Sequence, residues 1–108
     1  MIIKRKEAEM TQRDKTILDC LRKDHKGKHK AVHSKELEDR FNLCGRSLRR
    51  TIGRLRRERY PVCSCGEGYY YGTSQAEITE TVCRLDELVI KISGAKTGLL
   101  RSALKRRR

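Results

Sequence analysis

The 108-residue chain contains no tryptophan and one phenylalanine, and only 36% of its residues are hydrophobic. Aliphatic side chains must therefore fill a small core, and most helices must expose a wide polar face. Domains typically run to roughly 100–150 residues, so this length allows one domain with an appended element. Such a chain is too short to be a large enzyme.

The sequence also lacks a long apolar segment. It starts MIIKRKE, with two isoleucines ahead of a charge cluster, which is far short of a signal-peptide hydrophobic region. No basic amphipathic helix rich in Leu, Phe and Trp is present, so we expect no membrane association and a cytoplasmic, nucleoid-associated location. The five cysteines are an odd number without a secretory context, and we expect reduced thiols.

Acidic residues are scarce. The chain has 14 Asp and Glu against 27 Lys and Arg, which gives a formal net charge of +13. A charge of this size on so short a chain indicates a polyanionic partner, and nucleic acid is the first candidate.

Two helices are predicted in the first half of the chain. Aliphatic residues at helical spacing predict a first helix over residues 11–23, and a polar loop follows, whose end, AVHS, can form a short strand. Ser34 is then a suitable N-cap for a second helix. The core-facing residues of these helices are Ile17, Leu18, Leu21, Leu37 and Phe41.

A third helix is predicted over residues 45–57 after a short break at residues 42–45. Leu48, Ile52 and Leu55 recur at i, i+4 and i+7, which places them on one narrow stripe. Seven arginines crowd the rest of the helix and its end, offset only by Glu58. Such a helix repels itself, whereas a purely structural helix would intersperse acids for i, i+4 pairing.

These arginines point to duplex DNA. Side chains near the start of the helix, residues 46–50, would enter the major groove, where Arg can hold guanine O6 and N7. Those at residues 54–59 would meet phosphate and give affinity without sequence discrimination, and Gly53 would permit close backbone approach. The expected DNA-binding set is Arg46, Ser47, Arg49, Arg50, Gly53, Arg54, Arg56, Arg57 and Arg59.

The spacing of apolar residues changes from helical to strand-like after Arg59. Residues 60–64 are expected to be extended, residues 65–68 to turn and residues 69–71 to form a second strand, which together predict a β-hairpin. Its tip carries Glu67 and no Lys or Arg, which disfavours DNA contact there.

The last helical region is predicted to open with a capping box, Ser74 and Glu77. Its apolar residues then follow alternating steps of four and three, as in a coiled-coil seam, with an interruption at Lys96. Because one lone helix should not expose so much apolar surface, we expect it to cover a partner subunit or its own domain. Gly94 and Gly98 weaken the helix, but we favour one long helix over two. The expected dimer or partner residues are Ile78, Val82, Leu85, Val89, Ile92 and Leu99.

Residues 12–72 resemble the winged helix-turn-helix domains of bacterial and phage regulators of the biotin-operon-repressor kind. The shared pattern is a Ser-capped helix, a short turn, an arginine-containing recognition helix, a Tyr-Pro strand and a Gly-Tyr wing. It is carried here by Ser34, Glu36, Leu37, Phe41, Arg46, Arg49, Ile52, Leu55, Arg56, Tyr60, Pro61, Gly68 and Tyr69. The resemblance implies a fold, but neither a DNA site nor a small-molecule effector.

We therefore expect a mainly α fold with a small β-hairpin wing (α+β), a winged helix-turn-helix followed by a long C-terminal helix. Its parts would be a basic arm (1–10), the DNA-binding domain (11–73), a dimerisation or partner-binding helix (74–104) and a basic tail (105–108). The expected function is sequence-specific double-stranded DNA binding by a small prokaryotic or phage transcriptional regulator, acting as a homodimer. The alternative is a replication-origin binding, excision or assembly factor of a phage or mobile element, and RNA or nonspecific packaging is a weaker third hypothesis.

We expect neither a metal, a cofactor nor an enzymatic activity. The histidines at 25, 29 and 33 and the Cys63-x-Cys65 pair carry zinc-ligand chemistry, but the histidines cross a Gly-containing loop instead of sharing a helix face. No carboxylate pair, nucleophile with a spaced base or Gly-rich phosphate loop is present.

Overall fold

A computed structural model describes residues 10–106 of the chain, with side chains described as far as residue 103. The chain divides into two compact units, Met1–Ile78 and Thr79–Arg108. The expected basic arm (1–10) lies outside the described residues except for Met10, and the side chains of the expected basic tail (105–108) lie outside them as well.

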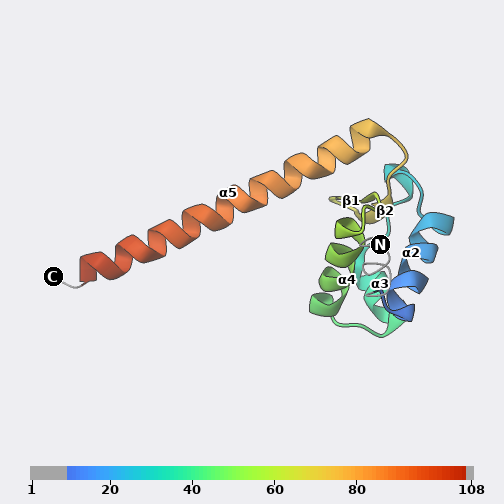
Figure 1. Cartoon of the computed structure of the whole chain (residues 1–108), viewed down its shortest axis with the longest axis horizontal. Helices are drawn as coiled ribbons and strands as arrows, with labels where there is room; N and C mark the ends of the chain where they lie inside the picture. The colour runs from blue at the N-terminus through green and yellow to red at the C-terminus, as the bar shows by residue number, and fades with distance from the viewer. Residues whose placement is uncertain (1–9, 107–108) are drawn as a thin grey trace, which may run out of the picture. The chain divides into compact units, whose positions relative to one another are not determined.

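The fold is mainly helical with a two-stranded antiparallel hairpin and a long C-terminal helix, which confirms the predicted α+β class (Figure 1). In chain order the described elements are α2 (Gln12–Asp24), the 3-10 turn η1 (Lys28–Lys30), α3 (Ser34–Phe41), α4 (Gly45–Arg57), β1 (Val62–Cys65), β2 (Gly68–Tyr71) and α5 (Gln75–Arg106).

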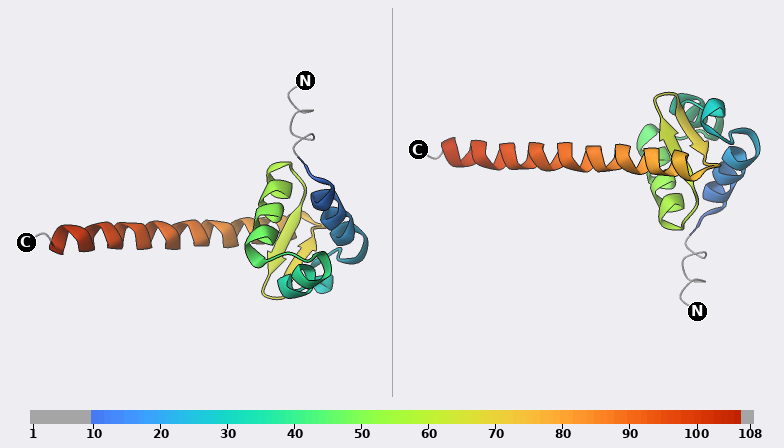
Figure 2. Two further views of the ribbon diagram at one scale, coloured as in Figure 1. Left: turned by 90° about the horizontal axis from the view of Figure 1, so that it is seen from below. Right: turned by 90° about the horizontal axis from the view of Figure 1, so that it is seen from above.

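The core of the first unit lies between the helices and the hairpin. Helix α2 contacts α4 and β2, and α4 in turn contacts α3 and β1, so that each strand runs beside one of the two longer helices (Figure 2). The buried apolar residues are those that helical spacing predicted, joined by residues of the hairpin. They include Ile17, Leu18, Leu21, Val32, Leu37, Leu48, Ile52, Leu55, Val62 and Tyr70.

Helix α3 begins one residue earlier than the sequence predicted. Its N-cap is His33, in extended backbone geometry, while Ser34 is the first helical residue, and no side chain caps the helix. The reason is the strand-like residue before it, because Val32 exchanges two backbone hydrogen bonds with Tyr69, at 2.8 and 2.9 Å. That pairing keeps the backbone extended up to His33, whose carbonyl then accepts from Glu36 and Leu37. The expected Ser34 cap is therefore wrong, and the expected short strand at residues 31–34 is a one-residue bridge.

The hairpin pairs β1 with β2 in the register Val62↔Tyr71 through Cys65↔Gly68. Gly68 has φ +129°, and a Cβ at this position would lie 2.0 Å from the carbonyl oxygen of Val32. Gly68 thus serves two purposes, because it permits a backbone conformation that L side chains avoid and lets the loop before α3 approach the hairpin.

Helix α5 is one continuous helix of 32 residues, as favoured from the sequence. The Ser74 hydroxyl accepts from the Glu77 amide at 3.2 Å, as the predicted capping box requires. The Glu77 carboxylate accepts chiefly from the amides of Thr73, at 2.8 Å, and of Lys28, at 3.0 Å, with a smaller contribution from the Ser74 amide, and these bonds lower the pKa of Glu77. None of the helices in the described part of the chain combines the length and the apolar character that a bilayer crossing requires.

Replacing Gly68 with Ala should lower the free energy of unfolding by about 3 kcal/mol, because the new methyl group meets backbone that cannot move without breaking the Val32–Tyr69 bonds. Urea denaturation followed by circular dichroism measures the change. Gly66→Ala is the matched control: it lies in the same turn with nothing within 4 Å of its Cβ position. Equal effects from the two changes would contradict this account of Gly68.

Candidate nucleic-acid interface

The exposed face of α4 is made of arginines. Arg46, Arg49, Arg50 and Arg57 are all exposed. At 100° per residue Arg46, Arg50 and Arg57 lie opposite the stripe of Leu48, Ile52 and Leu55, and Arg49 lies on the flank of the same exposed arc. Within the described residues none of the four arginines forms an ion pair. The face is therefore a concentrated positive surface.

Gly53 lies in the middle of this arginine face and is half-buried. A Cβ there would meet only the Nη1 of Arg57, at 3.5 Å, so the backbone does not need glycine at this position. What glycine does provide is a low point on the helix surface.

The N-terminus of α4 carries no side-chain cap and no acid in its first turn. Cys44 is the N-cap residue, and its Sγ lies 3.4 Å from the Ser47 hydroxyl. Hydrogen bonds that this hydroxyl and the nearby backbone amides donate to the thiolate lower the pKa of Cys44. The open amides and the positive end of the helix dipole therefore add to the charge of Arg46, Arg49 and Arg50.

Arg54, which the sequence predicted to contact phosphate, is engaged within the domain. Its Nε and Nη2 donate to the two carboxylate oxygens of Asp14 on α2, at 2.9 and 3.0 Å. Asp14 is 0% exposed and also accepts from the Thr51 hydroxyl at 3.1 Å. The Arg54 guanidinium is the main reason that the pKa of Asp14 lies below its usual value.

Arg56, also predicted to contact phosphate, is engaged on the other flank of α4. Its Nε donates to the Val62 carbonyl at 2.8 Å, and its Nη2 donates to the Ser64 hydroxyl at 3.3 Å. Burial lowers the pKa of this guanidinium. The two arginines at the borders of the exposed face thus attach α4 to α2 on one side and to β1 on the other.

Arg59 is exposed and adopts a left-handed backbone conformation, with φ +75°. The Tyr60 amide donates to the Leu55 carbonyl and the Arg59 amide to that of Arg56, which is a Schellman ending of α4. Glycine is the usual residue at this position, and Arg59 therefore carries a conformational cost.

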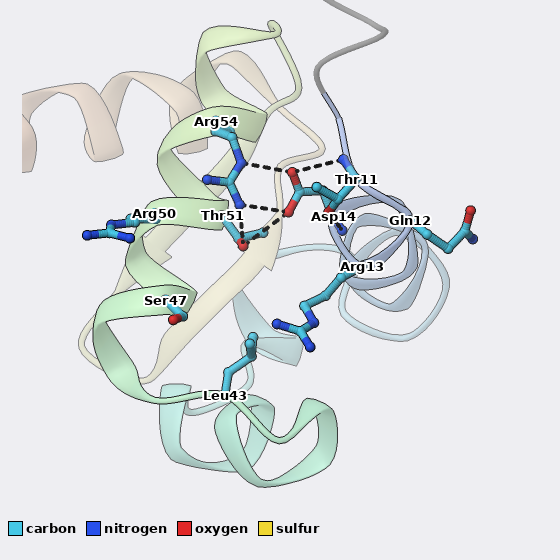
Figure 3. A pocket seen from close by; sticks show the side chains of 9 residues that line it. All are labelled: Thr11, Gln12, Arg13, Asp14, Leu43, Ser47, Arg50, Thr51 and Arg54. Atoms are coloured by element: carbon cyan, nitrogen blue, oxygen red, sulfur yellow. Dashed lines mark hydrogen bonds and ion pairs between the residues drawn. The ribbon is translucent and has the colours of Figure 1, made fainter.

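A groove of about 420 Å³ runs beside the exposed face, between the N-terminal end of α2 and α4. Figure 3 shows Arg13 of α2 reaching toward Ser47, while Arg50 points away from the groove and Arg54 turns to Asp14. The sequence did not single out Arg13 or Asp14. Only the pattern Thr11-x-x-Asp14, which forms a capping box at the start of α2, marked this place.

The hairpin tip adds no basic group to this surface. Glu67 lies 3.7 Å from the Nε2 of His33, and both side chains are exposed. Of the three tyrosines in β2, Tyr70 is fully buried and the other two are half-buried, so they mainly pack against the domain. The guanidinium of Arg22 lies over the rings of Tyr60 and Tyr71.

The residues with zinc-ligand chemistry are not gathered in one place. Among the described residues there is no group of three or more His, Cys, Asp or Glu side chains that could hold a metal ion. The His25 ring donates from Nδ1 to the Lys30 carbonyl at 2.9 Å, while Cys63 is buried and Cys65 half-buried.

No protein-family model, curated protein or solved structure matches this chain. The account of α4 therefore depends on its own geometry. The expected partner residues of α5 are likewise described by their geometry alone. Ile78 is half-buried, and the others are exposed, from 36% for Leu85 to 74% for Leu99.

Replacing Asp14 with Asn should lower the free energy of unfolding at pH 7 by about 2 kcal/mol, because Arg54 and Thr51 lose a buried anion, although the partial exposure of Arg54 moderates the loss. The pKa of Asp14 is lowered in the folded state, so the pair stabilises the protein above the unfolded pKa, near 3.8, and this stabilisation is lost as the pH falls through the folded pKa.

The difference between wild type and Asp14→Asn should consequently shrink below pH 4 in urea denaturation curves. Asp19→Asn, on the exposed side of the same helix, is the control and should change little. A difference between wild type and Asp14→Asn that stays constant from pH 7 to pH 3 would show that the ionised pair does not stabilise the fold.

Proposed function

We propose that this protein binds double-stranded DNA in a sequence-specific manner, as a small prokaryotic or phage transcriptional regulator of the winged helix-turn-helix kind. The observation that carries the proposal is the exposed face of α4, where four arginines gather without an acidic partner among the described residues. Location at the nucleoid in the cytoplasm belongs to the same proposal.

The dimensions of α4 suit the major groove. A helix of 13 residues is about 20 Å long, and the groove of B-form DNA, roughly 12 Å wide, admits an α-helix. Arg46, Arg49 and Arg50 lie in its first two turns, where recognition helices contact base edges, and Arg57 lies at the far end, where phosphate is the more accessible partner.

We propose a revised set of DNA contacts. Arg54 and Arg56 hold α4 in place, so their contribution is to orient the arginine face. Arg13, which lines the groove beside Ser47 and Arg50, joins the set as a phosphate contact from α2. The assigned contacts are Arg13, Arg46, Ser47, Arg49, Arg50, Arg57 and Arg59, with Gly53 at the point of closest approach.

A second candidate function is favoured by α5. Large apolar side chains on this helix are exposed, among them Leu88 at 52% and Ile92 at 66%. A replication-origin binding, excision or assembly factor that recruits another protein would use such a helix. Recovery of a replication or recombination protein bound to α5 would favour this function over simple repression.

Selection from a random duplex pool should yield a preferred sequence, and Arg50→Ala should then reduce the preference for it over random duplex by about 10- to 100-fold, the value of one bidentate base contact. Arg57→Ala should weaken binding to both duplexes by the same factor and reduce the salt slope by about one. Fluorescence anisotropy at several salt concentrations measures both effects.

Lys23→Ala is the control for these variants, because Lys23 is exposed at the opposite end of α2 and its loss removes the same charge. The assignment of roles is wrong if Arg50→Ala and Arg57→Ala act alike on selected and random DNA. Displacement from the selected site by unrelated duplex or RNA at equal concentration would indicate nonspecific packaging.

Arg59→Gly should separate folding from binding. Glycine relieves the left-handed backbone, so the free energy of unfolding should rise by about 1 kcal/mol, while loss of the charge should weaken binding to every duplex. Asn42→Gly is the matched control, since Asn42 also has a positive φ, 55°, but carries no charge and tolerates that conformation. Unchanged DNA affinity in Arg59→Gly would remove Arg59 from the interface.

A further inference from the structure

The apolar residues of α5 form a seam with heptad spacing. Taking Val82 as position a, the a positions hold Val82, Val89, Lys96 and Ala103, and the d positions hold Ile78, Leu85, Ile92 and Leu99. Side chains at a and d lie on one face of a helix, and such a face associates with another helix. The seam is exposed along its length apart from Ile78, which is half-buried.

The glycines of α5 lie away from this seam. In the same register Gly94 is at position f and Gly98 at position c, and nothing lies within 4 Å of a Cβ at either site. These residues soften the helix without interrupting the apolar face. The seam is therefore interrupted by Lys96 alone.

Charge is distributed unevenly along α5. Residues 75–90 carry four acids, Glu77, Glu80, Asp86 and Glu87, against the single base Arg84. Residues 91–106 carry five bases and no acid. The first half of the helix is thus acidic and the second half basic.

This polarity decides how a second copy would pair. Side-by-side parallel helices would set the basic halves against each other and place Lys96 against Lys96, and like charges at such close range repel. Antiparallel helices set each acidic half against a basic half. We infer that α5 pairs with α5 of a second copy of this chain as an antiparallel two-helix coiled coil.

Among the possible registers of the antiparallel pair, one buries the largest number of apolar layers. It centres between residues 90 and 91, so that Val89 packs against Ile92, Val82 against Leu99 and Ile78 against Ala103 of the second copy. Lys96 then lies level with Leu85 and Asp86 of the second copy, and its ammonium group can pair with the Asp86 carboxylate. Leu88, beside the seam at position g, lies level with Ser93 and about 3 Å along the axis from Ala95, the g residue of the second copy, whose small side chain leaves room for it.

The pairing also sets the distance between the points where the two helices join their DNA-binding units, a consequence that rests on the proposed function. With 1.5 Å per residue, the two Ile78 residues would lie about 38 Å apart along the coiled coil, against about 10 Å in a parallel pair.

Cysteine cross-linking tests the orientation without DNA. In a full-length background with Cys44, Cys65 and Cys83 changed to Ser, Val82→Cys and Leu99→Cys are made as separate proteins, mixed and oxidised. Antiparallel pairing places residue 82 of one copy beside residue 99 of the other, within reach of a disulfide, and holds identical residues about 25 Å apart. The expected result is a mixed 82–99 dimer and little cross-linking of either variant alone.

Each other result overturns the inference. Efficient 82–82 and 99–99 cross-links would show a parallel pair, and a dimer without any of these cross-links would place the interface elsewhere. A monomer in sedimentation at tens of micromolar would leave α5 without a second copy. Because the assay contains no DNA, failure of this inference leaves the proposed function standing, and failure of DNA binding leaves the cross-links unchanged.

A charge exchange tests the register in the protein with its native cysteines. Lys96→Glu and Asp86→Lys should each weaken the dimer about 5-fold or more, because each sets like charges side by side, and the double variant should recover most of the loss. Measurement is by sedimentation at low and high salt, and the single-variant losses should shrink at high salt. Lys91→Glu, outside the seam at position c, is the control. No recovery in the double variant would contradict the Lys96–Asp86 pairing.

Discussion

The ion pair between Asp14 and Arg54 fixes the position of α4, and the remaining features of the proposed interface depend on that position. Asp14 is buried, closes the first turn of α2 and accepts from two residues of α4. A buried carboxylate without such partners is energetically unfavourable, so separating or sliding the two helices would raise the free energy of the folded state. Arg56 makes the corresponding attachment to β1. Between these two contacts, the arginines that remain exposed share one face.

The faces of α4 could be predicted from the sequence because they follow from helical periodicity alone. Leu48, Ile52 and Leu55 are buried where their spacing placed them, and the arginine face lies opposite. Which arginines bond within the domain and which remain exposed could not be predicted in this way. Arg54 and Arg57 are three residues apart in the same turn of a basic helix, and only the approach of Asp14, forty positions earlier in the chain, distinguishes them.

Differences between the predicted and the observed helix caps also come from long-range contacts. Ser34 is a good capping residue by type, but the pairing of Val32 with Tyr69 keeps the preceding backbone extended and moves the N-cap to His33. Glu77 matched a capping box, yet its carboxylate binds the Lys28 amide, from a turn nearly fifty residues away. In each case a long-range contact decided between local alternatives that the sequence left nearly equal.

The two attachments of α4 also bear on the thermodynamics of association. A helix held by Arg54 on one flank and Arg56 on the other cannot rotate about its axis, so its backbone is ordered before any ligand arrives. The conformational entropy lost on binding is then mainly that of four long side chains, each with up to about 2 kcal/mol of rotamer entropy. These are the side chains of Arg46, Arg49, Arg50 and Arg57. Adaptation between protein and duplex would therefore come from these side chains and from bending of the DNA, with the helix acting as a rigid template.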